Sequence, residues 1–457
     1  MQQRTTRPGD GRKVAFATII GTTVEWYDFF IYASAAGLVF NKLFFAPAGA
    51  QLATLIAFAS VGVSFLFRPL GAFLAGHFGD RIGRRAILAI TLIMMGASTA
   101  LIGLLPTYDS AGLLAPVALV LLRIVQGLSA GGEWGGAVLM AVEHAPAGQR
   151  GRYGAFPQIG VPLGLLLASG VFALMSGVIA PGQAFLDWGW RVPFLLSIVL
   201  LFVGHWVRRS VEESPVFEEI KARKAGSRTP VLDLFRRRAL LVLLAALMFA
   251  GNSAVGYMTT GGFIQNYTTD PTGPLHLPRT PVLLVVTTAS AVWLAFTWLA
   301  GCWSDRIGRR NTYLTGFVVQ LLGVLALFPL VDTGSLGNVL LALCLLSVGT
   351  GLTYGAQSAF YAELFPASIR FSGVSISYAI GAILGGAFAP MIAKSLIAAT
   401  GSTVSVTLYL GGMTTIGFIA TLLLRDRSNI PLGPDHEAAQ AVSPVRLRNR
   451  QGQVRQA

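Results

Sequence analysis

In the first half of this sequence, five charged residues lie well inside stretches that are otherwise apolar, and their types could carry out chemistry. They are Glu25, Asp28, Arg68, Arg123 and Glu133. A charge inside a lipid bilayer is expensive, so such a residue by default faces a cavity or a partner and has a role. An acid there can bind and release a proton, while an arginine stays charged and can hold an acid or an anion.

Four of these residues, Glu25, Asp28, Arg123 and Glu133, are predicted to handle protons. At about 1.5 Å per helical residue, Asp28 and Arg123 reach similar depths, and Glu25 and Glu133 share a level nearer the inside. The alternatives are that Arg123 only neutralises an acid and that Glu25 only supports its helix. Arg68 falls near the inner interface, where a long side chain can reach water.

Neutral polar residues in the same apolar stretches are predicted to bind a ligand. Hydroxyl and amide groups hold a polar molecule without carrying protons. The second half of the chain has almost no buried acid, so we expect proton coupling in the first half and part of the ligand contact in the second. Hydrogen bonds between helices use the same residue types and are the alternative. The candidates are Tyr27, Tyr32, Gln126, Gln158, Asn252, Tyr257, Tyr354 and Gln357.

The composition indicates an integral membrane protein. Of 457 residues, 54% are hydrophobic and only 12% are charged, about half the charged share of soluble proteins. The net charge of +14 does not indicate a nucleic-acid partner, because the arginines lie in short loops rather than on one face. The two cysteines, Cys302 and Cys344, form no disulfide framework or metal motif, and neither a metal nor a cofactor is expected.

Two repeats predict that the chain is built from two similar halves. The hexapeptide Asp-Arg-Ile-Gly-Arg-Arg occurs at 80–85 and again at 305–310, an offset of 225 positions. The pattern Glu-x-x-Pro-Ala-x-x-Arg occurs at 143–150 and again at 363–370, an offset of 220. Two independent segments with nearly the same offset, each between apolar runs, indicate an internal repeat of membrane helices.

We therefore expect an all-α fold of 12 transmembrane helices in two pseudo-symmetric six-helix bundles. A bilayer span needs about 20 apolar residues, and the expected spans lie near 14–39, 52–78, 86–106, 113–142, 154–179, 190–208, 239–266, 280–303, 311–330, 336–361, 372–398 and 403–424. The expected regions are a tail at 1–13, bundles at 14–208 and 239–424, a linker loop at 209–238 and a disordered tail at 425–457.

Basic residues predict that both termini and the linker are cytoplasmic. Alternate loops are rich in arginine, and the only basic residues in the loops between them are Lys42 and Arg279. This bias in basic residues sets membrane orientation. The first apolar stretch carries Glu25 and Asp28 and has no small-residue cleavage site, so it is expected to stay as a span.

The two hexapeptides are also predicted to form a cytoplasmic gate. An acid at the end of a span can pair with a basic residue or with the positive N-terminus of a neighbouring helix. Such a contact forms only when the cytoplasmic ends are together, so it would favour an outward-facing state. The alternative is a charge cluster that only sets orientation, but orientation depends little on acids. The gate candidates are Asp80, Arg81, Gly83, Arg84, Asp305, Arg306 and Arg309.

These motifs resemble those of the major facilitator superfamily. The twin turns at 76–85 and 301–310 are similar to its loop motif, and Arg123-Ile124-Val125-Gln126-Gly127 is similar to a span-four motif whose arginine is implicated in proton transfer. The segments at 25–29, 67–71, 126–136 and 188–194 resemble the metabolite:H⁺ symporter family, with shikimate-type carriers most similar. The chain lacks a heptad-containing tail and the longer glycine-proline motif of drug antiporters.

The resemblance implies the major facilitator fold and a proton-coupled symporter that imports a small organic acid or zwitterion by alternating access. We expect it to act as a monomer in a bacterial inner (plasma) membrane, with a small-molecule substrate, protons and lipid as its partners. A proton-coupled exporter of drugs or metabolites with the same fold is the alternative. A membrane-embedded enzyme or sensor is a remote one, since the sequence shows no nucleophile–base set and no soluble catalytic domain.

Overall fold

The computed structural model describes residues 10–446, except residues 83, 209–229, 261 and 272. Within these residues the regular secondary structure is helical, and one isolated bridge joins Leu424 and Val445. Ten helical stretches are long and apolar enough to cross a bilayer, and Ile90–Leu104 is a shorter apolar helix. The N-terminal helix, which contains Glu25 and Asp28, completes a set of twelve crossings among the described residues.

The first six crossings come from residues 10–208. Their helices are α1 (Asp10–Ala35), α3 (Ala50–Ile82), α4 (Arg84–Leu104), α6 (Leu114–Ala130) continued by α7 (Glu133–Glu143), α8 (Arg150–Leu174) and α9 (Arg191–Arg208). Short elements extend or join them: η1 (Ala36–Phe40), α2 (Asn41–Leu43), η2 (Ala46–Ala48), α5 (Tyr108–Ala111), η3 (Met175–Ile179) and η4 (Phe185–Gly189).

The last six crossings come from residues 230–422. Their helices are α11 (Pro230–Thr260) with α12 (Phe263–Thr269), α13 (Arg279–Ile307), α14 (Arg309–Val331), α15 (Leu336–Leu364), α16 (Arg370–Gly385) with α17 (Ala389–Thr400), and α18 (Val404–Leu422). The remaining short elements are η5 (Ala367–Ile369), η6 (Pro434–His436) and α19 (Glu437–Ala441).

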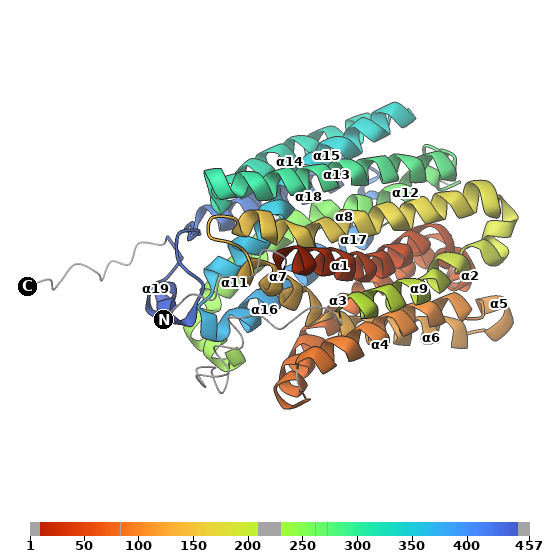
Figure 1. The fold of residues 1–457 in the computed structure, drawn as a ribbon. Helices are drawn as coiled ribbons and strands as arrows, with labels where there is room; N and C mark the ends of the chain where they lie inside the picture. The colour runs from red at the N-terminus through yellow and green to blue at the C-terminus, as the bar shows by residue number, and fades with distance from the viewer. Residues whose placement is uncertain (1–9, 83, 209–229, 261, 272, 447–457) are drawn as a thin grey trace, which may run out of the picture.

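The crossings form two bundles that meet along a long interface. In the first bundle α1 packs on α8 and α9, and α3 packs on α6; in the second, α15 packs on α13 and α14, and α11 packs on α16 and α18. The bundles meet where α8 contacts α13 and α15, and where α3 and α7 contact α16. Figure 1 shows the long helices running side by side, with α2, α5 and α12 at one end and α19 at the other.

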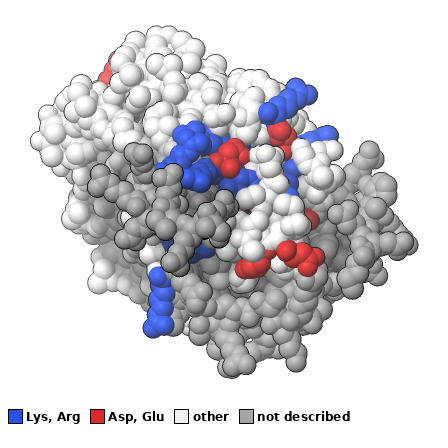
Figure 2. Space-filling model, turned by 90° about the vertical axis from the view of Figure 1, so that its left-hand side faces the viewer, with Lys and Arg blue, Asp and Glu red and all other residues white. Residues whose placement is uncertain are grey.

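Apolar side chains cover the outer surface of these helices, as contact with lipid requires. Leu66, Leu70 and Phe73 of α3 and Phe202 of α9 are all exposed. A soluble protein rarely exposes so much contiguous apolar surface. Figure 2 shows the end of the molecule that holds α19, where arginines and acids gather. Charged side chains thus gather at this end of the molecule, while exposed apolar side chains lie along the helices.

Glycine allows α3 and α6 to approach closely, and this approach positions the buried arginines. A Cβ atom at Gly127 would lie 2.2 Å from the carbonyl oxygen of Ser64, and one at Gly131 would lie 2.1 Å from that of Arg68. Small residues permit such backbone contact between membrane helices. The contact brings Arg123, one turn before Gly127, against the backbone of α3.

The C-terminal segment differs from the expectation of a disordered tail. Up to residue 446 it folds back, forming the bridge between Leu424 and Val445 and the short helix α19. Arg427 is buried and donates to the carbonyl oxygens of Ala439, Gln440 and Val442. These backbone contacts order a polar, Pro- and Gln-containing segment. Residues 1–9 and 447–457 of the expected tails, and 209–229 of the expected linker, lie outside the described residues.

Candidate functional site

Asp28 of α1 is buried in the first bundle without a compensating cation. Its side chain is 1% exposed, and the hydroxyl of Ser197 on α9 donates to its Oδ1 at 2.6 Å. Thr99 of α4 lies beside the carboxylate, and the charge of Glu133 acts on it. Among the described residues Asp28 forms no ion pair, and its Oδ2 has no hydrogen bond. A bound proton would remove the cost of this isolated charge.

Arg123 does not form the expected ion pair with Asp28 in this conformation. Its guanidinium donates to Gln126 Oε1 at 2.7 Å, to Ser64 Oγ at 2.8 Å and to the carbonyl oxygen of Val61 at 3.0 Å. It also lies 3.9 Å from the centre of the Tyr32 ring, a favourable cation–π geometry. Neutral acceptors on α3 and α6 therefore occupy Arg123, because the close helix contact brings backbone carbonyls within its reach.

An indirect connection still joins Asp28 to Arg123. Gln126 accepts from Arg123 through Oε1 and donates through Nε2 to Thr99 Oγ1 at 2.7 Å. Thr99 in turn lies beside Asp28. A change in the charge of Asp28 can thus reach Arg123 through a polar chain of two side chains, with no direct contact.

A second polar cluster lies at the interface of the bundles. Glu25 and Arg68 of the first bundle act electrostatically on Tyr257 and Tyr378 of the second, and Arg68 also acts on Tyr354. All five side chains are buried. The three tyrosines come from α11, α15 and α16, so this cluster exists only when the two bundles are together.

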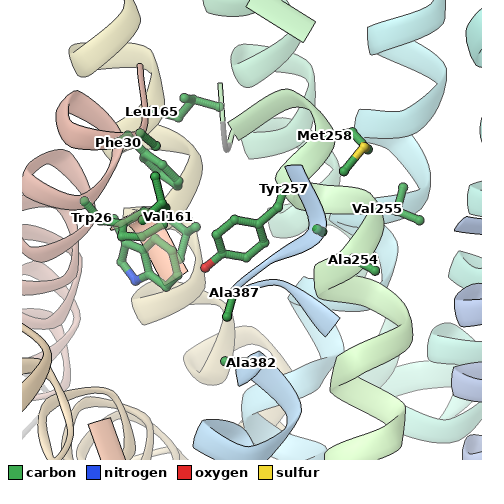
Figure 3. Packing of buried hydrophobic residues seen from close by; sticks show 14 of the residues in the cluster. Trp26, Phe30, Val161, Leu165, Ala254, Val255, Tyr257, Met258, Ala382 and Ala387 are labelled. Carbon is green, nitrogen blue, oxygen red and sulfur yellow. The ribbon is translucent and has the colours of Figure 1, made fainter. Parts of the chain in front are cut away.

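Tyr257 reaches furthest across the interface. Its ring stands edge-on to Phe29 and Phe65 of the first bundle, with ring centres 5.5 and 5.6 Å away. Figure 3 shows it extending from α11 toward Trp26 and Val161. Its buried hydroxyl has no hydrogen bond to another described residue, so it is able to bond a ligand that reaches the interface.

The other predicted ligand-binding residues fall into two groups. Gln158 crosses the interface, because its Nε2 lies 3.3 Å from both Gln357 Oε1 and the carbonyl oxygen of Tyr354. Tyr27, Tyr32 and Asn252 instead hold helices within one bundle. Tyr27 donates to the carbonyl oxygen of Pro193, Tyr32 shares a hydrogen bond with Ser60, and Asn252 accepts from Thr353. In this conformation only the first group lies between the bundles.

Sequence reasoning missed several residues of the site. Trp134 of α7 donates to Gln158 Oε1 at 3.0 Å, and its ring stacks on Tyr378 with centres 3.7 Å apart. Tyr378 stacks in turn on Phe249, at 4.3 Å. Tyr378 sits in a small-residue helix with the same apolar context as packing residues, and Ser197 looks like any interhelical serine. The one usable signal was the position of Trp134 next to Glu133.

The second hexapeptide joins the two bundles at the end of the molecule that holds α19. Asp305 accepts hydrogen bonds from the backbone N–H groups of Gly151 and Arg152, at 2.8 and 2.9 Å. These are in the first turn of α8, so Asp305 on α13 caps a helix of the other bundle. Arg309 donates to Asp305 at 2.7 Å and holds it in place. Arg306 is exposed. Gly83 and the side chains of Asp80, Arg81 and Arg84 lie outside the described residues.

The two copies of the second repeat form ion pairs with each other across the bundles. Arg370 of α16 pairs with Glu143 of α7 at 3.1 Å, and Arg150 of α8 pairs with Glu363 of α15 at 3.5 Å. Each arginine therefore binds the glutamate of the other copy. Arg309 also pairs with Glu363 at 3.3 Å. Sequence analysis identified this repeat but not the partners.

The opposite end is closed as well. Asn266 donates to the carbonyl oxygen of Gly37 at 3.0 Å, and the hydroxyls of Ser176 and Thr280 are 3.2 Å apart. A space between the bundles beside Trp293 measures about 10 Å³, room for about one water molecule. The structure is thus closed at both ends around a buried polar interface.

Two six-helix bundles that close around a polar interface define a membrane transporter. Residues 14–234 match the family model described as "Sugar (and other) transporter", and residues 258–452 match "Major Facilitator Superfamily". The chain is 39% identical to the inner membrane metabolite transport protein YhjE of Escherichia coli K12, covering 93% of this chain and 96% of that protein. The chain belongs to the major facilitator superfamily.

Two further relatives and one solved structure extend the comparison. The Escherichia coli K12 shikimate transporter is 39% identical, covering 92% of this chain and 98% of that protein. The proline/betaine transporter of the same organism is 31% identical, covering 93% and 85%. The structure of the proton:xylose symporter XylE bound to 6-bromo-6-deoxy-D-glucose has a TM-score of 0.73 and 19% identity, covering 92% and 96%. That likeness shows the fold.

These comparisons confirm the family resemblance and the expected fold class. The chain is a multi-pass transporter of a bacterial inner membrane, and it is not an enzyme. They do not test the individual site residues, the region boundaries or the orientation of the termini, which remain predictions.

Proposed function

We propose that this transporter is a proton-coupled symporter that imports a small organic acid or zwitterion. One observation carries the proposal: Asp28 is buried in the first bundle with a hydroxyl as its hydrogen-bond donor and no ion pair among the described residues. An isolated carboxylate inside a bilayer protein is costly when charged. A carboxylate that gains and loses a proton during the cycle therefore makes the two protonation states differ in conformational energy.

The route by which Asp28 affects the rest of the molecule follows from its contacts. Ser197 and Thr99 tie it to α9 and α4, and Gln126 continues the polar chain to Arg123. When Asp28 is protonated, its hydrogen-bond demand changes from accepting only to accepting and donating. We expect this change to favour closure around bound substrate. Loss of the proton on the cytoplasmic side then favours release and return.

The substrate class rests on the relatives and on the interface cluster. Two relatives are named for shikimate and for proline and betaine, compounds that each contain a single carboxylate. The interface offers hydroxyl and amide groups of Tyr257, Tyr354, Gln158 and Gln357. The proposal requires no metal or organic cofactor, since the proton is the coupling ion, and it requires a single copy of the chain.

Proteoliposomes with an imposed pH gradient test this function. We expect the wild-type protein to accumulate its substrate when the compartment that supplies it is acidic. We expect Asp28→Asn to lose gradient-driven accumulation while keeping substrate exchange across the membrane, because asparagine preserves the shape but carries no titratable proton. Accumulation by Asp28→Asn at the wild-type level would contradict the proton site. Accumulation only when the pH gradient is reversed would favour an exporter.

A further inference from the structure

Arg68 of α3 is a buried cation whose charge has no partner in the described part of the chain. The residue is 4% exposed. Its guanidinium makes no hydrogen bond or ion pair with another described residue, and its Nε is buried without a partner. Arg123 is the useful contrast, since it donates to acceptors on α3 and α6. A guanidinium has five N–H donors, so those of Arg68 remain for another molecule.

Three aromatic rings lie close to the Arg68 guanidinium. Its guanidinium carbon lies 4.3 Å from the centre of the Phe65 ring, 5.7 Å from that of Trp26 and 6.0 Å from that of Phe29. Ring faces attract a cation and exclude water, but they do not neutralise its charge. The charge of Arg68 also acts unfavourably on Arg123. An anion that binds at Arg68 would therefore relieve an electrostatic cost that the protein alone leaves in place.

Two rings link Arg68 to the other bundle. The guanidinium carbon of Arg68 lies 6.0 Å from the centre of the Phe29 ring and 4.3 Å from that of Phe65. Tyr257 of the other bundle stands edge-on to the same two rings, with centres 5.5 and 5.6 Å away. The hydroxyls of Tyr257 and Tyr378 are buried and have no hydrogen bond among the described residues. One cation from the first bundle and two unused hydroxyls from the second thus face one region. A ligand there would be contacted by both bundles, as alternating access requires.

We propose that Arg68 binds the carboxylate of the transported molecule. This inference rests on the proposed function and names the chemistry of the same site. The guanidinium of Arg68 can hold a carboxylate through two parallel hydrogen bonds.

Binding to purified protein in detergent tests the assignment without any proton gradient. The probes are shikimate, succinate, glycine betaine and the neutral amide of shikimate, each titrated by tryptophan fluorescence or calorimetry. We expect a carboxylate to bind the wild-type protein more tightly than the neutral amide does. For Arg68→Gln we expect its affinity to fall about 10- to 100-fold, the range for hydrogen bonds to a charged group. We expect Arg68→Lys to fall less, since it keeps the charge and loses the fork.

The controls separate loss of binding from loss of folding. Arg236→Gln removes an exposed arginine near the start of α11 and is expected to bind as the wild type does. In Tyr257→Phe the ring packing stays and only the hydroxyl is lost, so a smaller loss of affinity is expected. The ratio of affinities for shikimate and its amide, measured within one variant, does not depend on the folded fraction. That ratio should approach one in Arg68→Gln.

Several results would overturn the assignment. They are unchanged carboxylate affinity in folded Arg68→Gln, tighter binding of the neutral amide than of any carboxylate in the panel, and no binding of any carboxylate in the panel. Tighter binding of glycine betaine than of shikimate would support it and identify a zwitterion as the ligand. Because Asp28→Asn is not used here, failure of the proton proposal would leave this result standing, and the reverse also holds.

Discussion

At the scale of single residues, Arg123 and Asp28 have separate surroundings although both are buried in the first bundle. Arg123 holds backbone carbonyls of α3 and the amide of Gln126, and Asp28 accepts from Ser197 on α9. A direct ion pair would fix both charges in one place. Because Gln126 and Thr99 lie between the two groups, the carboxylate of Asp28 can change its charge while the guanidinium of Arg123 keeps α3 and α6 together.

Replacement of Arg123 by lysine tests this division. Lysine keeps the charge, but it cannot reach the Val61 carbonyl, the Ser64 hydroxyl and the Gln126 amide at once. We expect Arg123→Lys to lower the free energy of unfolding by about 1–3 kcal/mol, because buried acceptors lose their donors. Thermal unfolding in detergent measures it, with Arg236→Lys as the exposed control. Unchanged stability together with unchanged uptake would show that the contacts of Arg123 are incidental.

Residue types and depth were readable from the sequence, and partners were not. The apolar context of Asp28, Arg123 and Glu133 is enough to predict their burial. The acceptors of Arg123 include main-chain carbonyls, which no side-chain pattern reports. The unpaired state of Arg68 depends on the packing of α3 against α16, so depth alone suggested a side chain reaching for water. Burial can thus be predicted locally, while pairing requires the tertiary structure.

At the scale of elements, helix ends at the end of the molecule that holds α19 are held together across the bundles. Asp305 caps α8, and the Glu143–Arg370 and Arg150–Glu363 pairs cross the interface in opposite directions. All of these contacts must break for this end, which is predicted to be cytoplasmic, to open. The sequence repeat predicted that the two segments are equivalent, but the exchange of partners became visible only when both bundles were placed.

Charge exchange tests the Glu143–Arg370 pair. Loss of one member of a buried pair costs about 3–5 kcal/mol, so we expect Glu143→Arg or Arg370→Glu alone to shift the protein toward a cytoplasm-open state. We expect the double variant to restore closure in part. Ser375→Cys, which is buried against Gly135, reports opening through its labelling rate in a background without Cys302 and Cys344. Equal labelling in the singles and the double would argue against the pair.

At the scale of the whole molecule, the C-terminal segment joins the two bundles on the charged face. Arg150 of α8 donates to the carbonyl oxygen of Ile430 at 2.8 Å. Gln440 accepts from the Ala367 backbone N–H at 2.8 Å and from Arg370 at 3.0 Å. Composition suggested disorder here because the segment has few apolar residues. It is ordered instead by polar contacts to a folded surface, which a local pattern does not contain.

The orientation of this charged face in the membrane remains a prediction with a direct test. Arginine-rich loops are retained on the cytoplasmic side, and Figure 2 shows arginines and acids at the end of the molecule that holds α19. We expect green fluorescent protein fused after Arg446 to fluoresce in bacterial cells and alkaline phosphatase fused there to be inactive. An active phosphatase fusion would place the C-terminus outside and invert the proposed gate.

The central claim is that proton movement and substrate movement share one cycle through Asp28. The most direct measurement imposes a substrate gradient on proteoliposomes that enclose a pH-sensitive dye, with no initial pH difference. We predict that substrate entry acidifies the interior in the wild-type protein, and that Asp28→Asn carries substrate without acidification. Two results would contradict the account. One is substrate entry without any pH change in the wild-type protein. The other is equal acidification by Asp28→Asn and the wild-type protein.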